Sequence, residues 1–273
     1  MGRRFGWLAV LLVGLALFAL VYQTLIHTQN LNFVPAMILL GASVMPATFV
    51  TYVASRGGGG GRLPASLIAG TALLGGVLGT VVAGRLEFDT LRALGTVPVI
   101  AVGLAEEAAK LVVPVVLVLL LPRLPAFTAR IGPGPALDPA DGVIIGVAVG
   151  MGFAVLETMG YAFVTIVSHG GIGGVEELLF LRGLLSPVGH AAWTGLTSAA
   201  LWRWAAGQRH GARHFFLLFL LAAALHATWD GAGSLPVMAV VAAVSAYGLI
   251  HEVHRSALSP GSGSGIGAAA RPS

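Results

Sequence analysis

Eight long stretches of apolar residues dominate this sequence. A helix needs about 20 apolar residues to cross the hydrocarbon core of a bilayer. The stretches that meet this requirement are residues 6–26, 33–54, 65–84, 93–121, 142–168, 183–206, 214–232 and 234–251. Apolar residues make up 56% of the 273 residues and charged residues only 10%, and the mean hydropathy is +0.90. A soluble fold could not cover so much apolar surface. The sequence therefore predicts an all-α, polytopic membrane helix bundle of about eight transmembrane helices.

The two ends of the chain differ in character. The first apolar stretch follows Arg3 and Arg4, as in a signal peptide, but it is longer than an h-region and no A-x-A site follows it. We therefore expect a retained transmembrane helix. Residues 258–273 are rich in glycine and serine and predict a disordered cytoplasmic tail. Residues 1–257 are expected to form a single transmembrane domain, and the proline-rich residues 122–141 an extended loop.

The distribution of arginine predicts the orientation. With the N-terminus in the cytoplasm, 11 of the 14 arginines fall in cytoplasmic segments, and only Arg85, Arg92 and Arg182 fall outside. Cytoplasmic loops carry such an excess of positive charge. We therefore expect a multi-pass cell-membrane protein with both termini in the cytoplasm and the lipid bilayer as its surroundings. Topology accounts for the scattered basic residues, and nucleic acid is not an expected partner. Arg182 lies near the outer interface, where solvated charge is usual.

Ionisable residues inside the predicted spans are the strongest functional signal. They are Glu106, Glu107 and Lys110 in 93–121, Glu157 in 142–168, His190 in 183–206, and His226 and Asp230 in 214–232. Each would cost about 2.5–3.5 kcal/mol at the bilayer centre if it faced lipid. At 1.5 Å per residue, their depths overlap between the midplane and the outer leaflet. Small residues such as Gly146 and Gly150 permit close helix contact. We expect these side chains to face inward and converge on one water-containing cavity.

Carboxylates and imidazoles in such a cavity suit hydrolysis. A glutamate can take a proton from a water molecule that attacks an amide carbonyl, and a histidine or Lys110 can stabilise the oxyanion. Alternatively, His190 and His226 with one or two glutamates, of which Glu107 and Glu157 are the candidates, can hold Zn²⁺, which activates the water. The residues leave metal-free and metal-assisted hydrolysis both open. The chain has no cysteine, which excludes thiolate catalysis and Cys-ligated zinc, and it has no H-E-x-x-H motif.

Four motifs resemble those of the PrsW family of intramembrane proteases. They are Glu106-Glu107-x-x-Lys110, Phe153-x-x-x-Glu157, Ser186-Pro187-x-x-His190 and His226-x-x-x-Asp230, which cover residues 93–232. The first three predicted helices resemble the family only in being hydrophobic. The family belongs to a superfamily with the CAAX prenyl endopeptidases and bacterial self-immunity membrane proteins. In those relatives the second motif usually carries histidine, so Glu157 favours the PrsW branch. The last motif often ends in asparagine, where this chain has Asp230.

The resemblance implies a role for each residue. Glu106 and Glu107 would be the catalytic pair, one of them activating water. Glu157, His190 and His226 would complete the site as metal ligands or as groups that position water. Asp230 would orient His226 or water, and Lys110 would be a structural or electrostatic partner. The implied activity is cleavage of a single-span membrane protein, such as an anti-sigma factor, on the extracytoplasmic side.

Three other functions are compatible with the same residues. Chains of Glu, His and Lys within a membrane also form the proton relays of transporters, although no clear sequence repeat favours a transporter. A CAAX-type prenyl-protein endopeptidase is a second alternative. A non-catalytic scaffold with a buried salt-bridge network is a third, and it predicts that Glu106→Gln chiefly lowers stability.

Overall fold

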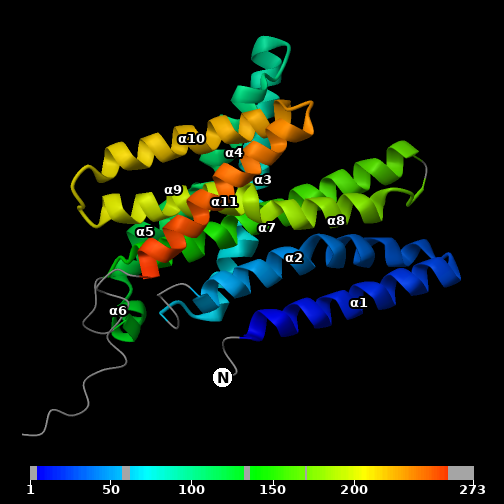
Figure 1. Cartoon of the computed structure of the whole chain (residues 1–273), viewed down its shortest axis with the longest axis horizontal. Coiled ribbons are helices and arrows are strands. Elements are labelled where there is room, and N and C mark those ends of the chain that lie inside the picture. The colour runs from blue at the N-terminus through cyan, green and yellow to red at the C-terminus, as the bar shows by residue number, and fades with distance from the viewer. Residues whose placement is uncertain (1–4, 57–61, 132–135, 170, 258–273) are drawn as a thin grey trace, which may run out of the picture.

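The structure is a computed structural model that describes residues 5–56, 62–131, 136–169 and 171–257. Within these ranges the regular elements are all helical, which confirms the predicted fold class. The expected tail, residues 258–273, lies outside the described residues. The α-helices, shown in Figure 1, are α1 (Gly6–Thr28), α2 (Val34–Arg56), α3 (Ala65–Leu94), α4 (Val99–Lys110), α5 (Val112–Leu120), α6 (Pro125–Ile131), α7 (Pro139–His169), α8 (Val175–Leu185), α9 (His190–Ala205), α10 (Gly211–Gly231) and α11 (Leu235–Ala257).

The described residues contain six helices that are long and apolar enough to cross a membrane: α1, α2, α3, α7, α10 and α11. A seventh span is added when the helices within Val99–Arg123 and Pro125–Ile131, which meet at a bend of 78°, are taken together. The chain is therefore a multi-pass membrane protein with six to seven candidate spans, where about eight were expected. Part of the expected loop 122–141 is also helical, as α6.

The expected span 183–206 is an interrupted helix. A 3-10 turn over Ser186–Val188 separates α8 from α9. Pro187 has no N–H to donate, so it cannot continue the hydrogen bonding of α8. The 16 residues of α9 cover about 24 Å, which is less than the hydrocarbon thickness of about 30 Å. Figure 1 shows α8 and α9 following one another in the same direction beside α7.

α7 lies at the centre of the bundle and packs against α9, α3 and α2. Three of its glycines, Gly142, Gly146 and Gly150, are four residues apart and face α9. A Cβ atom at Gly142 would lie 2.9 Å from the carbonyl oxygen of Ser198, and one at Gly150 would clash with the backbone of His190. The backbones of α7 and α9 therefore approach closely, as the small residues at this spacing predict.

α3 crosses α7 at a second glycine contact. A Cβ atom at Gly76 would lie 2.6 Å from the carbonyl oxygen of Gly152. α3 continues to Leu94, ten residues beyond its expected end, and stops at Gly95, whose φ of 71° is the left-handed conformation typical of a helix C-terminus. Glu87, beyond the expected end of this span, therefore lies on α3.

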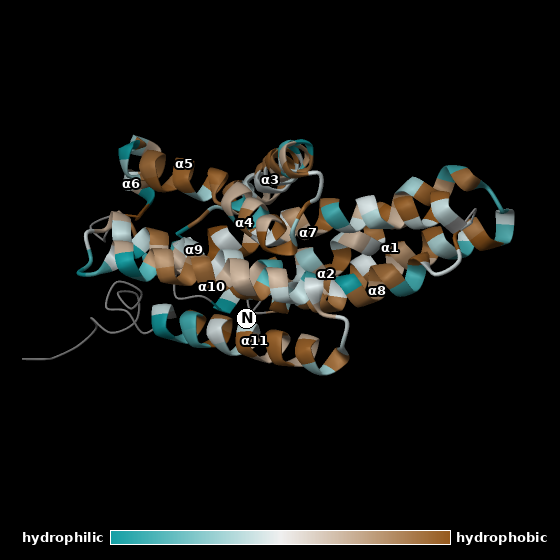
Figure 2. Cartoon of the chain, turned by 90° about the horizontal axis from the view of Figure 1, so that it is seen from above, coloured by the Kyte–Doolittle hydropathy of each residue, from teal (hydrophilic) through white to brown (hydrophobic). Residues whose placement is uncertain are grey.

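The outer helices expose apolar side chains. On α1, Leu12, Val13 and Leu20 are exposed, and Leu25 is its one buried residue. Figure 2 shows the hydrophobic colour spread over the outward faces, with hydrophilic residues gathered at several helix ends. This pattern suits helices surrounded by lipid.

One end of the bundle brings three connections together. Arg62, which precedes α3, places its Nε atom 3.0 Å from the Oδ2 atom of Asp141 at the start of α7. Arg130 of α6 donates from Nε to the carbonyl oxygen of Arg62 at 3.0 Å. These basic residues belong to segments expected on the cytoplasmic side, and they lie on the same side of the molecule.

Candidate active site

α4 supplies three buried charged residues at its C-terminal end. The Nζ atom of Lys110 lies 3.2 Å from Glu106 Oε2 and 2.7 Å from Glu107 Oε1. The lysine is three and four residues from these carboxylates, a spacing that brings side chains to the same face of a helix. α4 ends at Lys110 because Pro114, four residues on, has no N–H to donate to the Lys110 carbonyl group.

α10 contributes His226, which contacts both glutamates. Its Nδ1 atom lies 2.9 Å from Glu107 Oε1, and its Nε2 atom lies 3.4 Å from Glu106 Oε2. Nε2 is also 3.4 Å from Asp230 Oδ2, one helical turn away on α10. Gly103 permits this approach of α4 to α10, because a Cβ atom there would lie 2.5 Å from the carbonyl oxygen of Ala223.

α7 and α9 complete the cluster through Glu157 and His190. The Nε2 atom of His190 lies 2.9 Å from Glu157 Oε2, and its Nδ1 atom lies 2.8 Å from Lys110 Nζ. The ring of Phe153 packs against Lys110, with Nζ 4.1 Å from the ring centroid. His190 is the first residue of α9, so the interruption after α8 places this imidazole inside the bundle.

The structure therefore brings together all seven ionisable residues expected to converge. They come from α4, α7, α9 and α10, and we call them the polar layer: Glu106, Glu107, Lys110, Glu157, His190, His226 and Asp230. Its inner members Glu107, Lys110 and His226 are at most 1% exposed. At its outer edge the side chain of Asp230 is 35% exposed. The polar layer thus leads from the interior of the bundle to its surface.

Arg182 of α8 also belongs to this site, although an arginine near the outer interface was expected to be solvated. Its Nη2 atom lies 2.6 Å from Glu157 Oε2, and its Nε atom donates to Thr158 Oγ1 at 3.0 Å. The guanidinium carbon lies 4.3 Å from the ring centroid of Tyr161. The signal in the sequence was the Ser186-Pro187 pair. Because this proline ends α8, α8 is a separate short helix, and its last turn places Arg182 beside α7.

Glu87 is a second residue that the sequence did not single out. It lies on the extended part of α3 and is half-buried, within electrostatic range of Glu106, Glu157 and Asp230. α3 therefore adds a fifth carboxylate close to the polar layer.

The donor set fits a divalent metal ion. Glu106, His190 and His226 offer one carboxylate oxygen and two ring nitrogens that lie within 4.8 Å of one another. Two histidines and one glutamate, with a position left for water, are typical of catalytic zinc sites. Glu107 holds the Nδ1 atom of His226, which is the usual support for a metal-ligating histidine. The other oxygen of Glu107, Oε2, is buried without a hydrogen-bond partner among the described residues.

This set differs from the ligands expected from the sequence. Glu107 and Glu157 were expected beside the two histidines, but the structure groups Glu106 with them. Glu107 is engaged by Lys110 and His226, and Glu157 by His190 and Arg182. Each of these two carboxylates therefore contacts one histidine and lies outside the group of three candidate ligands.

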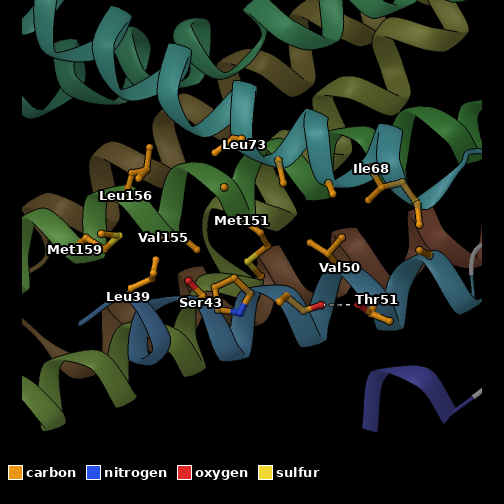
Figure 3. Close-up of a pocket in the computed structure, with 17 residues that line it drawn as sticks. Leu39, Ser43, Val50, Thr51, Ile68, Leu73, Met151, Val155, Leu156 and Met159 are labelled. Atoms are coloured by element: carbon orange, nitrogen blue, oxygen red, sulfur yellow. Dashed lines mark hydrogen bonds between the residues drawn. The ribbon is translucent and has the colours of Figure 1, made fainter. Parts of the chain in front are cut away.

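A large apolar pocket lies apart from the polar layer. It has a volume of about 650 Å³ and is lined by α2, α3 and α7. Figure 3 shows Leu39 and Val50 of α2, Leu73 of α3 and Val155 of α7 around it. None of its lining residues belongs to the polar layer.

Comparison with known proteins gives one match. The model of a family described as PrsW family intramembrane metalloprotease matches residues 63–251, more than two thirds of the chain. The match begins at the start of α3, so it extends beyond the four motifs and includes a helix expected to share only hydrophobicity with the family. No curated protein and no solved structure shows significant similarity to the chain.

Proposed function

The chain belongs to the PrsW family of intramembrane metalloproteases, and on that premise we propose that it hydrolyses peptide bonds of single-span membrane proteins at the polar layer. The observation that supports this most is the grouping of Glu106 with His190 and His226 inside a membrane helix bundle. The family implies membrane-anchored regulators, such as anti-sigma factors, as the class of substrate.

The two glutamates have different surroundings and hence different roles. Glu107 is fixed by two contacts of 2.7 and 2.9 Å, to Lys110 and to His226. Glu106 has only contacts of 3.2 and 3.4 Å and is slightly more exposed. In metal-free hydrolysis, Glu106 is therefore the carboxylate that meets the attacking water and accepts its proton, and Glu107 is the group that orients His226.

Glu107 sets the protonation pattern of His226. When Nδ1–H donates to Glu107, the lone pair of Nε2 points toward Glu106 and Asp230. That nitrogen can then accept a proton or bind an ion. Arg182 and Lys110 provide positive charge that offsets the charge developing on the carbonyl oxygen.

A divalent ion would be held by Glu106, His190 and His226. Such an ion polarises the attacking water and the scissile carbonyl group when it is bound. Glu107 and Glu157 would orient the two histidines, through the contacts described above.

The orientation of the bundle completes the proposal. The arginine distribution favours an orientation with both termini in the cytoplasm of a cell-membrane protein. Arg182 and Asp230 then lie toward the outer leaflet, so the substrate reaches the polar layer from the extracytoplasmic side.

The test is cleavage of a single-span reporter in proteoliposomes. Glu106→Gln and Glu107→Gln should each lower the rate by about 100-fold or more, the contribution expected of a positioned acid–base group. Glu176→Gln on the exposed first turn of α8 is the matched control and should retain the wild-type rate. Full activity in both Glu106→Gln and Glu107→Gln would eliminate the proposed mechanism.

A further inference from the structure

Lys110 is the single lysine of the chain, and it sits where the site would hold a metal ion. Its side chain is fully buried. Its Nζ atom contacts two of the three candidate ligands, Glu106 Oε2 at 3.2 Å and His190 Nδ1 at 2.8 Å. The ammonium group therefore already supplies positive charge to the ligand set.

The contact with His190 excludes a metal ion at the same nitrogen. An ammonium group only donates hydrogen bonds, so Nδ1 of His190 must accept with its one lone pair. The proton of the ring is then on Nε2, where it donates to Glu157 Oε2. Neither nitrogen of His190 has a lone pair available for coordination while both contacts last.

Electrostatic repulsion also disfavours a metal ion beside the Lys110 ammonium group. A metal ion bonded to Glu106 and His190 would have an ammonium group as a close neighbour, since that group contacts the same two residues. Two like charges a few ångströms apart in a buried site repel each other strongly. Conversely, an ion that replaced the ammonium group would restore positive charge beside Glu106 and Glu107.

We propose that Lys110 is a built-in competitor of the divalent metal: its ammonium group and the ion are alternative partners of His190, and the ion binds there only when Lys110 has moved away. The protein thus has a state in which its own side chain supplies positive charge to the carboxylates without metal. Metal affinity is set by the strength with which Lys110 is held. The competition rests on the ion site of the proposed function, and it can be measured as zinc binding without an assay of cleavage.

The first experiment is a zinc titration of the full-length, chelator-treated protein by calorimetry. Lys110→Met removes the ammonium group and keeps an unbranched apolar side chain. It should bind zinc at least about tenfold more tightly than the wild type. Glu106→Gln in the Lys110→Met background removes one ligand and should abolish the gain, which separates the site from surface histidines common to all variants.

Stability provides a second readout of the same variant. Without its lysine, the chain has two buried carboxylates that lack a cation, so Lys110→Met should melt at a lower temperature than the wild type. Added zinc should raise the melting temperature of Lys110→Met more than that of the wild type. If Lys110→Met is recovered only when zinc is present during purification, the result supports the competition.

The third experiment uses the fact that the chain has one lysine. Wild-type protein labelled with ¹³Cε-lysine gives a single lysine signal by NMR, and saturating zinc should shift it. A lysine signal that stays unchanged while zinc binds the wild type in a manner that requires Glu106 would overturn the proposal. So would a Lys110→Met variant that gains neither zinc affinity nor zinc-dependent stability.

Discussion

Two buried ionic clusters in this bundle differ in how completely their groups are paired. The first cluster lies at the C-terminal end of α9, at the other end of that helix from His190. There Arg203 donates from Nη1 to Glu252 Oε2 of α11 at 3.1 Å and from Nη2 to Glu252 Oε1. Ser256 donates to the same Oε1 at 2.8 Å. One cation faces one anion, and both carboxylate oxygens are occupied.

The polar layer has no such balance. Lys110 is shared between Glu106, Glu107 and His190, and one oxygen of Glu107 has no partner among the described residues. Buried polar groups are usually paired, and an exception calls for an explanation such as catalysis or an ion. Buried charge alone therefore does not mark a site in this bundle, because incomplete pairing is what separates the two clusters.

The largest effect is expected from a substitution that breaks the Arg203–Glu252 pair. Arg203→Met leaves Glu252 buried without its partner, which should cost about 3–5 kcal/mol of unfolding free energy. Reporter cleavage per folded molecule should remain at the wild-type level, because neither residue contacts the polar layer. The measurement is denaturant unfolding in detergent micelles together with the cleavage rate. The double variant Arg203→Met/Glu252→Leu should regain most of the stability, and a double variant as unstable as the single one contradicts the interpretation.

The next largest effect is expected from a substitution within the polar layer. His226→Gln removes the ring that links Glu106, Glu107 and Asp230, and the cleavage rate should fall by about 100-fold. His214→Gln on the same helix, outside the polar layer, is the control and should keep the wild-type rate. The comparison is made at equal amounts of folded protein. A His226→Gln variant that keeps more than a tenth of the activity would remove His226 from the proposed mechanism.

The smallest effect is expected at Arg182, and it tests whether this residue belongs functionally to the polar layer. Arg182→Met removes the guanidinium group from Glu157 and should lower kcat about tenfold, with a smaller change in KM, because Arg182 holds Glu157 in position and supplies positive charge to the site. Arg182→Lys keeps the charge but not the two-point contact, and it should recover part of the rate. Steady-state kinetics of both variants provide the measurement. Equal rates in Arg182→Met and the wild type would return Arg182 to a purely structural role.

Local helix geometry made part of the site predictable. The spacing of Glu106, Glu107 and Lys110 fixed their mutual contacts, and the cost of charge in lipid required that they face inward. The same cost predicted that Glu157, His190 and His226 join them. The partners within the polar layer could not be predicted. Adjacent residues on a helix point about 100° apart, so the choice between Glu106 and Glu107 beside the two histidines depends on the rotation of α4 against α10.

Breaks within helices are the feature of the fold that composition predicts least well. Residues 183–206 have the composition of a single span, but Pro187 divides them, and α8 begins eight residues earlier than the expected helix. Arg182, expected at the interface just before the span, therefore lies on α8 and contacts Glu157. Glu87 was missed for a related reason, because α3 continues beyond residue 84. Composition locates apolar runs well, but it does not report where a helix stops or turns within them.

The interruption before His190 has one more consequence. A helix has no internal acceptor for its first N–H groups, and at Gly189 no side chain caps them. The start of α9 therefore brings amide N–H groups that lack an acceptor within the helix, and the positive end of a helix dipole, to the depth at which the acidic side chains gather. A spanning helix without a break would have kept those donors at the water interface, so the kink after α8 changes the electrostatics of the bundle interior without any additional charged residue.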